Sequence, residues 1–526
     1  MAKNREVPQT LAFYDKVGKM KKFVNWFKKD PLFATLILSI IAVAIFFLTA
    51  NYNSRVSIIA DSSRDVQVAR YAADHGKIPQ IGQFSSAGPF FYGPWYYWFL
   101  EITSFLPLGP LTHWYVMTLI YLGFVILIFF LGYELGGKVT GAFASLFAAI
   151  SPAQIASSTS VWNPAIIPLL SLLSLIFLVR FAKYRRLLDL WLLGLIVGLA
   201  VTIHFQSFLI LPILPTALFL ALFIKPKLHP LKAAVVLFFG FLIPFLPLIY
   251  FDARFHWHNF TSLFVYLTVD QFRIWIPNRW LTYLFDYWPQ TWANIIGGQR
   301  AIGFLLIGLL GILTLAKLKE FKKQSIFYLV AVTFILEVIA YRYYRGERFF
   351  YYSFFAHPAI LVLSATCIQK IWQAKKIVGL AITALVIATT IPQSFKNLKE
   401  PGVSFREINS LKQEIYLSFP NQKVDIYGCR ENTTSISHPL ALFMYLEGRN
   451  ETSGVKIGVC EIGNDLTWQV ISQDATKTEK GLWFNKSTEE VYRHTVEWWI
   501  KDPPPTGGSL WQFVKKSLSP RCYPHC

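Results

Sequence analysis

Long runs of apolar residues, separated by short polar connections, follow one another along the chain up to about residue 392. A helix needs roughly 17–25 residues to cross a hydrocarbon core of ~30 Å, and most of these runs have about that length. The pattern therefore predicts a mainly α-helical, polytopic membrane protein with about 11 transmembrane helices. We expect them at residues 31–51, 112–133, 139–158, 164–182, 188–205, 207–224, 232–250, 301–316, 325–341, 352–369 and 375–392.

The distribution of lysine and arginine gives the expected orientation. The N-terminal segment 1–30 is basic, and every second connection between apolar runs also carries lysine or arginine. Because cytoplasmic loops are enriched in these residues, we expect a cytoplasmic N-terminus and a multi-pass protein of the cell (plasma or inner) membrane. The transmembrane domain then covers residues 31–392, with large outer loops at 52–111 and 251–300. The apolar stretch 90–107 is expected to lie in the outer interface, since a crossing there would invert every later loop.

Ordinary polar spacing returns after residue 392. Residues 393–526 contain strand-like segments such as VDIYGC and VKIGVCEI and a helix-like segment, LALFMYLEG, which together predict a small extracytoplasmic α/β domain. An outer location permits disulfides, which we favour over a metal site at the C-Y-P-H-C ending. The cysteines of this domain, whose pairing the sequence does not define, are Cys429, Cys460, Cys522 and Cys526.

Composition agrees with a membrane protein and excludes some partners. Hydrophobic residues make up 54% of the chain and charged residues 15%, whereas soluble domains carry about 25% charged residues. The aromatic content of 17% suits interfacial belts. A formal net charge of +20 could suggest nucleic acid, but the basic residues lie mostly in short loops, as topology requires. No nucleic-acid partner is expected.

Acidic residues stand where the first apolar run gives way to water. Asp61 and Asp65 are four residues apart, so in a helix they would share one face, with Arg64 beside them. An ionisable group at the end of a spanning helix is a functional hypothesis by default. Such a carboxylate can act as a general base or hold a metal ion. The alternative is a solvated acid paired with Arg55 or Arg64.

Two further motifs follow this acidic segment. Residues 69–79 contain an A-R-x-x-x-x-x-G-x-x-P spacing, and residues 93–98 read G-P-x-Y-Y-W. With the preceding acid, this order resembles the GT-C class of membrane glycosyltransferases, which includes the protein O-mannosyltransferases and the aminoarabinose transferases (glycosyltransferase family 39-like). Many members have Asp-Glu where this chain has Asp61-Ser62, with its next acid at Asp65.

The resemblance implies a GT-C-like transmembrane domain and an outer-face reaction. A sugar would pass from a polyprenyl-phosphate donor to a lipid, glycan or protein acceptor, with Asp61 as the base that activates the acceptor. Asp65 would be the second catalytic acid. Membrane lipids are the other expected partners, and a divalent metal ion is the one candidate cofactor.

Several outer positions are candidates for the cavity of such an enzyme. Trp162 and Asn163 form a turn between two spans, although Asn-Pro also suits a helix start. His204 and Gln206 are polar groups at the end of the fifth span, although a lone histidine is more often a packing residue. The resemblance implies acceptor or cavity contacts for these residues, and a metal-ligand role for His204. The remaining cavity candidates are Arg64 and Tyr92.

Arginines between the ninth and tenth spans lie on the outer side, where topology does not require them. Guanidinium groups suit phosphate, and the resemblance implies that late outer-loop basic residues hold the donor phosphate. The alternative is an ion-pair cluster with Glu337 and Glu347, or contact with lipid headgroups. The candidates for donor-phosphate binding are Arg342, Arg345, Arg348 and Tyr352.

Other function classes remain open from the sequence. The chain contains no Walker loop, dinucleotide glycine fingerprint, H-E-x-x-H or G-x-S-x-G motif. An enzyme of this kind needs an energised donor that arrives through the bilayer. A lipid or sugar transporter or flippase is the main alternative, although it predicts charges deep within the spans. A scaffold that presents the C-terminal domain is a third possibility.

Overall fold

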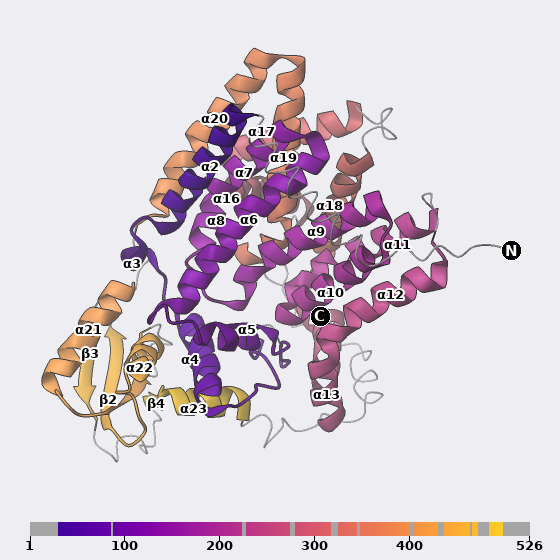
Figure 1. Ribbon diagram of the computed structural model, residues 1–526. Coiled ribbons are helices and arrows are strands. Elements are labelled where there is room, and N and C mark those ends of the chain that lie inside the picture. The colour runs from indigo at the N-terminus through magenta and orange to yellow at the C-terminus, as the bar shows by residue number, and fades with distance from the viewer. Residues whose placement is uncertain are drawn as a thin grey trace, which may run out of the picture.

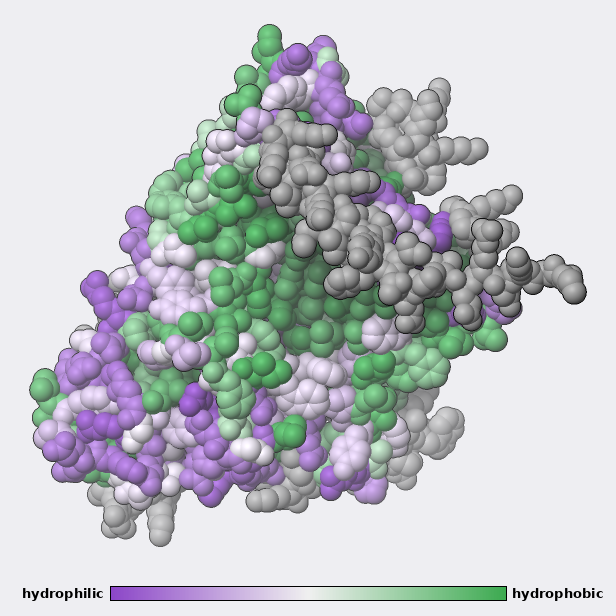
Figure 2. Space-filling view, viewed as in Figure 1, coloured by the Kyte–Doolittle hydropathy of each residue, from purple (hydrophilic) through white to green (hydrophobic). Residues whose placement is uncertain are grey.

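The structure, a computed structural model, describes residues 30–85, 88–223, 228–273, 279–316, 325–344, 348–399, 404–429, 436–462, 465–471 and 483–497. The basic segment 1–29 lies outside them. A bundle of helices forms most of the molecule, and a small sheet with its own helices lies beside one end of the bundle (Figure 1). The surface over the bundle is largely hydrophobic, whereas the surface over the sheet unit is hydrophilic (Figure 2).

Within the described residues, eight helical segments are long and apolar enough to cross a membrane. A further pair, Trp280–Ile295 and Arg300–Ala316 (α17), is bent by 99° and could form a ninth span. These segments confirm a multi-pass, mainly helical protein. The eight are Pro31–Thr49 (α2), Thr112–Gly136 (α6), Asn163–Tyr184 (η1 and α9), Phe205–Phe223 (η2 and α11), Pro230–Arg254 (α12, η3 and α13), Ile326–Tyr343 (in α18, Ser325–Tyr343), Phe350–Ala374 (η7 and α19) and Lys376–Lys396 (α20).

The count of about 11 spans is not confirmed. Two of the predicted spans correspond to shorter apolar helices, Lys138–Ala149 (α7) and Leu187–Ile203 (α10). The predicted span 139–158 is interrupted because Ser151 caps a new helix, accepting a hydrogen bond from the Gln154 amide at 3.3 Å, and Pro152 begins that helix (α8, Pro152–Ser157). At 1.5 Å per residue, α7 alone is about 18 Å long, too short for the hydrocarbon core.

Glycines bring α10 (Leu187–Ile203) and α12 (Pro230–Leu242) into close contact. A Cβ atom on Gly194 would lie 2.4 Å from the Leu237 carbonyl oxygen, and one on Gly198 would lie 2.3 Å from the Phe241 carbonyl oxygen. Small residues four apart allow two helix backbones to approach in this way. The contact fixes the end of α10, which carries His204.

Short helices form the two segments that the sequence predicts to be outer loops. Residues 52–111 contain α3 (Tyr52–Arg55), α4 (Ala60–His75) and α5 (Trp95–Ser104). Residues 251–300 contain the end of α13 (Leu246–Arg254), followed by α14 (His258–Thr268), η4 (Asp270–Arg273), α15 (Arg279–Thr282), η5 (Tyr283–Tyr287) and α16 (Trp288–Ile295). α5 has only ten residues, and its end exposes Ile102 and then Phe105, each 70% exposed. It does not span a membrane.

The C-terminal unit is a mixed four-stranded sheet of order β3-β2-β1-β4 with helices against it. Its strands are β1 (Val424–Cys429), β2 (Val455–Ile462), β3 (Asp465–Val470) and β4 (Trp483–Asn485). β1 and β2 are parallel and joined through α22 (Ser437–Leu446); the other pairs are antiparallel. The other helices are α21 (Phe405–Ser418), α23 (Thr488–Tyr492) and η9 (Arg493–Glu497).

Disulfide pairing in this unit stays a prediction. Cys429 ends β1 and Cys460 lies in β2. Cys522 and Cys526 lie outside the described residues.

Candidate active site

A cavity of about 600 Å³ brings together half of the residues that the sequence singled out. α4 supplies one wall and the segment after it a second. The turn before α9, the end of α10 and η7 (Phe350–Ala356) supply the rest. The predicted residues that line it are Asp61, Arg64, Tyr92, Trp162, Asn163 and His204. The other lining residues are Gln83, Phe84, Ser85, Gly88, Pro89, Pro164 and Tyr351.

α4 places the two acids one turn apart, as their spacing predicts. The helix begins at Ala60 after the extended residue Ile59 and ends where Gly76 adopts the left-handed conformation with φ 60°. Its first turn carries Asp61, and Asp65 follows on the same face. The helix therefore presents both carboxylates toward one side.

Arg64 lies between these two carboxylates. Its Nη1 atom donates to Asp61 Oδ1 at 2.8 Å, and its Nη2 and Nε atoms donate to Asp65 Oδ1 at 2.9 and 3.0 Å. The Asp61 side chain is 55% exposed, whereas that of Asp65 is 1% exposed. The acids are therefore not equivalent, and only Asp61 is accessible to a ligand in the cavity.

Two residues that sequence reasoning missed complete the surroundings of Asp65. The Gln83 amide donates to Asp65 Oδ2, and the Tyr97 hydroxyl donates to Asp65 Oδ1 at 3.4 Å. Gln83 follows a Gly/Ser/Pro-rich turn, and Tyr97 belongs to an aromatic run, so neither spacing shows that they reach Asp65. Arg64, Gln83 and Tyr97 all donate to the Asp65 carboxylate. Asp65 therefore holds Arg64 in place rather than contacting a substrate.

Burial and charge shift the ionisation of this cluster. Burial raises the pKa of Asp65 to about 6, although Arg64 beside it acts in the opposite direction. Burial alone would lower the pKa of Arg64, but the interactions with Asp65, Tyr97 and Asp61 together outweigh it and keep that pKa above its ordinary value. Arg64 therefore stays cationic, and Asp65 is ionised above about pH 6.

Aromatic rings form the inner wall of the cavity. His204 follows α10 in an extended conformation and stacks on Tyr92, with ring centroids 5.1 Å apart. It also lies edge-on to Tyr351 and Tyr352, at 6.0 and 6.3 Å. These contacts agree with the packing interpretation of His204.

Two residues of the turn before α9 line the cavity. One connects the turn to α10, and the other has a buried N–H group without a hydrogen-bond partner among the described residues. Asn163 Nδ2 donates to the Ile203 carbonyl at 2.8 Å, which ties the turn to the end of α10. Trp162 Nε1 is buried and has no hydrogen-bond partner among the described residues. Because Trp162 lines the cavity, its indole N–H is a donor that a bound hydroxyl could use.

Gln206 lies in a different cavity from His204. The chain enters η2 (Phe205–Ile210) directly after His204, and this turn directs Gln206 into an apolar cavity of about 260 Å³. Both amide atoms of Gln206 are buried without a hydrogen-bond partner in the described structure. The other lining residues are Phe205, Phe208, Leu209, Leu267, Gln271, Ala340, Tyr341, Tyr343 and Tyr344.

Two of the arginines proposed for phosphate, Arg342 and Arg348, lie near this apolar cavity. The Arg342 guanidinium lies 4.0 Å from the ring centre of Trp280. Arg348 Nη2 donates to the Arg342 and Tyr344 carbonyls at 3.4 and 3.1 Å, which caps the end of α18. Tyr352 is buried, and Arg345 lies outside the described residues.

The residues of the larger cavity do not fit a bound divalent metal ion. Arg64 already supplies the cation between the two carboxylates. His204 stacks among aromatic rings, and the part of the chain that the structure describes contains no group of three His, Cys, Asp or Glu residues that could hold a metal ion. We derive no step through a metal.

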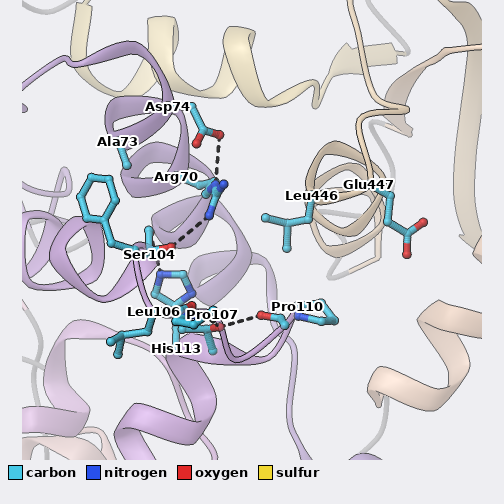
Figure 3. A pocket seen from close by; sticks show the side chains of 13 residues that line it. Arg70, Ala73, Asp74, Ser104, Leu106, Pro107, Pro110, His113, Leu446 and Glu447 are labelled. Carbon is cyan, nitrogen blue, oxygen red and sulfur yellow. Dashed lines mark hydrogen bonds and ion pairs between the residues drawn. The ribbon is translucent and has the colours of Figure 1, made fainter.

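A further cavity, of about 500 Å³, lies between α4, the α5–α6 connection and α22 (Figure 3). Its polar groups largely pair with one another: Arg70 contacts Asp74 at 3.0 Å and the Ser104 carbonyl at 3.0 Å, and His113 contacts Ser104. None of the predicted site residues lines it.

The fold has known counterparts, although no family model and no curated protein matches the sequence. ArnT from Cupriavidus metallidurans in the apo state aligns at TM-score 0.54 and 12% identity, covering 81% of this chain and 93% of ArnT. ArnT bound to undecaprenyl phosphate gives 0.53 at 11% identity, covering 81% and 92%. The oligosaccharyltransferase AglB from Archaeoglobus fulgidus gives 0.48 at 10% identity over 75% of this chain, and the chain spans only 60% of its length. The likeness to ArnT confirms the GT-C-like fold that the motifs implied.

The raised pKa of Asp65 predicts a pH dependence of stability. The folded protein keeps the Asp65 proton up to about pH 6, whereas the unfolded chain releases it near pH 4. As pH rises between these values, the wild type should therefore lose stability relative to Asp65→Asn, by roughly 2–3 kcal/mol in all. Thermal unfolding of both proteins at pH 4, 5, 6 and 7 measures this difference. A wild type that gains stability relative to Asp65→Asn over this range would show a lowered pKa instead.

Proposed function

We propose that the protein is an outer-face glycosyltransferase that uses a polyprenyl-phosphate sugar as donor. The observation that carries the proposal is the accessible carboxylate of Asp61, oriented by Arg64 at a cavity of about 600 Å³. The GT-C-like fold supports it, because ArnT, which shares this fold, was solved with undecaprenyl phosphate bound. The sugar and the acceptor are left open.

Asp61 acts as the general base in this reaction. Arg64 binds its Oδ1 atom, and no hydrogen bond among the described residues involves Oδ2. Oδ2 accepts the proton of an acceptor hydroxyl. The acceptor oxygen then forms a bond to the anomeric carbon of the sugar, while the bond from that carbon to the phosphate oxygen breaks. The phosphate leaves on the polyprenyl chain.

The remaining cavity residues bind and orient the sugar and the acceptor. Trp162 offers both its ring face and its buried N–H. Tyr92 and Tyr351 supply further aromatic surface around the site. Gln83 donates to Asp65, which in turn holds Arg64 and so fixes the direction of the Asp61 carboxylate.

The apolar cavity around Gln206 receives the first part of the donor lipid. Its tyrosine, phenylalanine and leucine side chains suit an isoprenoid chain, and the unpaired Gln206 amide supplies a donor for a phosphate oxygen. The phosphate itself lies toward Arg342, Arg348 and Tyr352. Arg345, outside the described residues, is a further candidate to bind it. Phe205 and Tyr352 stand between this cavity and His204, which lines the larger one.

Substitution of the base tests the proposal directly. Asp61→Asn keeps the shape of the side chain but cannot accept a proton, so sugar transfer should fall about 10²–10⁴-fold. The measurement is transfer of radiolabelled sugar by purified protein in lipid, with a panel of polyprenyl-phosphate sugars as donors and a membrane extract as acceptor.

Asp286→Asn is the matched control, because Asp286 is also exposed and paired with an arginine, Arg300, at 2.8 Å. It should keep full activity. Transfer that survives Asp61→Asn would contradict the assignment of the base. No transfer with any donor, together with flipping of labelled lipid by the wild type, would favour a transporter or flippase.

Gln206 is expected to lower the stability of the ligand-free protein and to strengthen its binding of the lipid donor. Gln206→Met removes a buried amide whose missing hydrogen bonds cost about 1–3 kcal/mol, so the ligand-free protein should become more stable. Its affinity for polyprenyl phosphate should fall about tenfold, which corresponds to ~1.4 kcal/mol. Thermal unfolding and lipid-binding measurements test both effects, with the exposed Gln290→Met as control. A less stable variant with unchanged lipid binding would show that the amide is only structural.

A further inference from the structure

The C-terminal unit contacts α4 along much of the length of this helix. Apolar residues on one side of α4, Val68, Tyr71 and Ala72, form a cluster with Val491, Tyr492 and Val496 of α23 and η9. Figure 1 shows α23 beside α4, with the sheet and α22 next to them. The helix that carries Asp61 and Arg64 is thus held between the membrane bundle and the C-terminal unit.

Gln67 makes the polar contact closest to the charged cluster. Its Nε2 atom donates to the Lys486 carbonyl at 2.9 Å and to Thr488 Oγ1 at 3.2 Å. Its Oε1 atom lies 3.0 Å from His438 Nδ1, in the geometry of an acceptor. The Gln67 side chain is fully buried, and its amide donates and accepts within the C-terminal unit.

The other polar contacts of α4 with this unit lie at its far end. Asp74 accepts a hydrogen bond from the Tyr445 hydroxyl at 3.1 Å, and Lys77, just beyond the helix, pairs with Glu497 at 2.6 Å. Figure 3 shows Arg70 and Asp74 of α4 facing Leu446 and Glu447 at the end of α22. The contacts of Asp74 and Lys77 are more than two turns from the acids, whereas Gln67 follows Asp65 by two residues.

We infer that the C-terminal unit positions the catalytic segment of α4, and that Gln67 is the positioning residue through which it acts. A buried, fully hydrogen-bonded amide specifies one arrangement of the groups around it, because any displacement leaves polar atoms unpaired. Gln67 therefore fixes the rotation of α4, and its position along its axis, against α22 and the connection from β4 to α23. Through the helix, it fixes Arg64 and Asp61 at the cavity.

The role in catalysis rests on the proposed function, but the positioning itself can be measured without it. Gln67→Met keeps the length of the side chain and removes its hydrogen bonds. Amide hydrogen exchange of residues 60–66 should become about tenfold faster, because the lost hydrogen bonds of Gln67 lower the local stability of this part of α4. Exchange in the membrane bundle should not change.

Kinetics distinguish positioning from a general loss of folded protein. In Gln67→Met, kcat for sugar transfer should fall about 10- to 100-fold, because displacement of a catalytic group by about 1 Å has effects of this size. The KM for the lipid donor should stay within about twofold, since Gln67 touches neither cavity. Thr488→Val removes a partner from the other side of the contact, and the double variant should be no worse than Gln67→Met alone.

Asp74→Asn is the matched control. It weakens a contact between α4 and the same unit at the far end of the helix, so it should change neither the exchange of residues 60–66 nor kcat. Unchanged exchange in Gln67→Met, or equal effects of Asp74→Asn, would overturn the inference. A wild type without transferase activity would contradict the proposed function, while the exchange data would still decide the positioning role.

Discussion

The guanidinium group of Arg64 lies between two carboxylates of unequal exposure, and the organisation of the site depends on this arrangement. Asp65 is buried and receives donors from Arg64, Gln83 and Tyr97, so it cannot reach a ligand. Asp61 receives a single contact from Arg64 and remains accessible. One arginine thus contacts both acids, of which one is buried and the other is accessible for the base role that we propose. It also occupies the position that a metal ion would need between them.

Larger parts of the fold keep this cluster in place. Close packing of α10 on α12 at Gly194 and Gly198 sets the end of α10, where Asn163 and Tyr92 contact Ile203 and His204. From the opposite side, the C-terminal unit holds α4 through the Gln67 amide and an apolar cluster. A polar cavity and an apolar cavity then lie on either side of the His204–Gln206 segment. This arrangement suits a substrate that is half sugar and half lipid.

The features that the sequence predicted correctly are local or periodic. Apolar run lengths predict a polytopic helical protein, and the spacing of Asp61 and Asp65 predicts their common helix face. Gln83 reaches Asp65 through the geometry of a loop, and Gln67 contacts residues that are distant in the sequence. The periodicity of apolar positions predicts neither kind of contact. The sequence places Gln206 two positions after His204 and predicts a common cavity, but η2 directs the two side chains into different cavities. Ser151 and Pro152 start a new helix within one predicted span. A hydropathy pattern is averaged over many residues, so it does not detect such a local helix start.

A structure of the wild-type protein in lipid, with a non-transferable polyprenyl-phosphate sugar analogue bound, tests the role of Asp61 most directly. We expect the sugar to lie in the cavity of Asp61 and Trp162, within hydrogen-bonding distance of the Asp61 carboxylate, and the lipid to enter beside Gln206. Arg64 should still contact both acids. A sugar bound in the cavity of Arg70 and Asp74, or one that contacts Asp65 after Arg64 has moved away, would contradict the account.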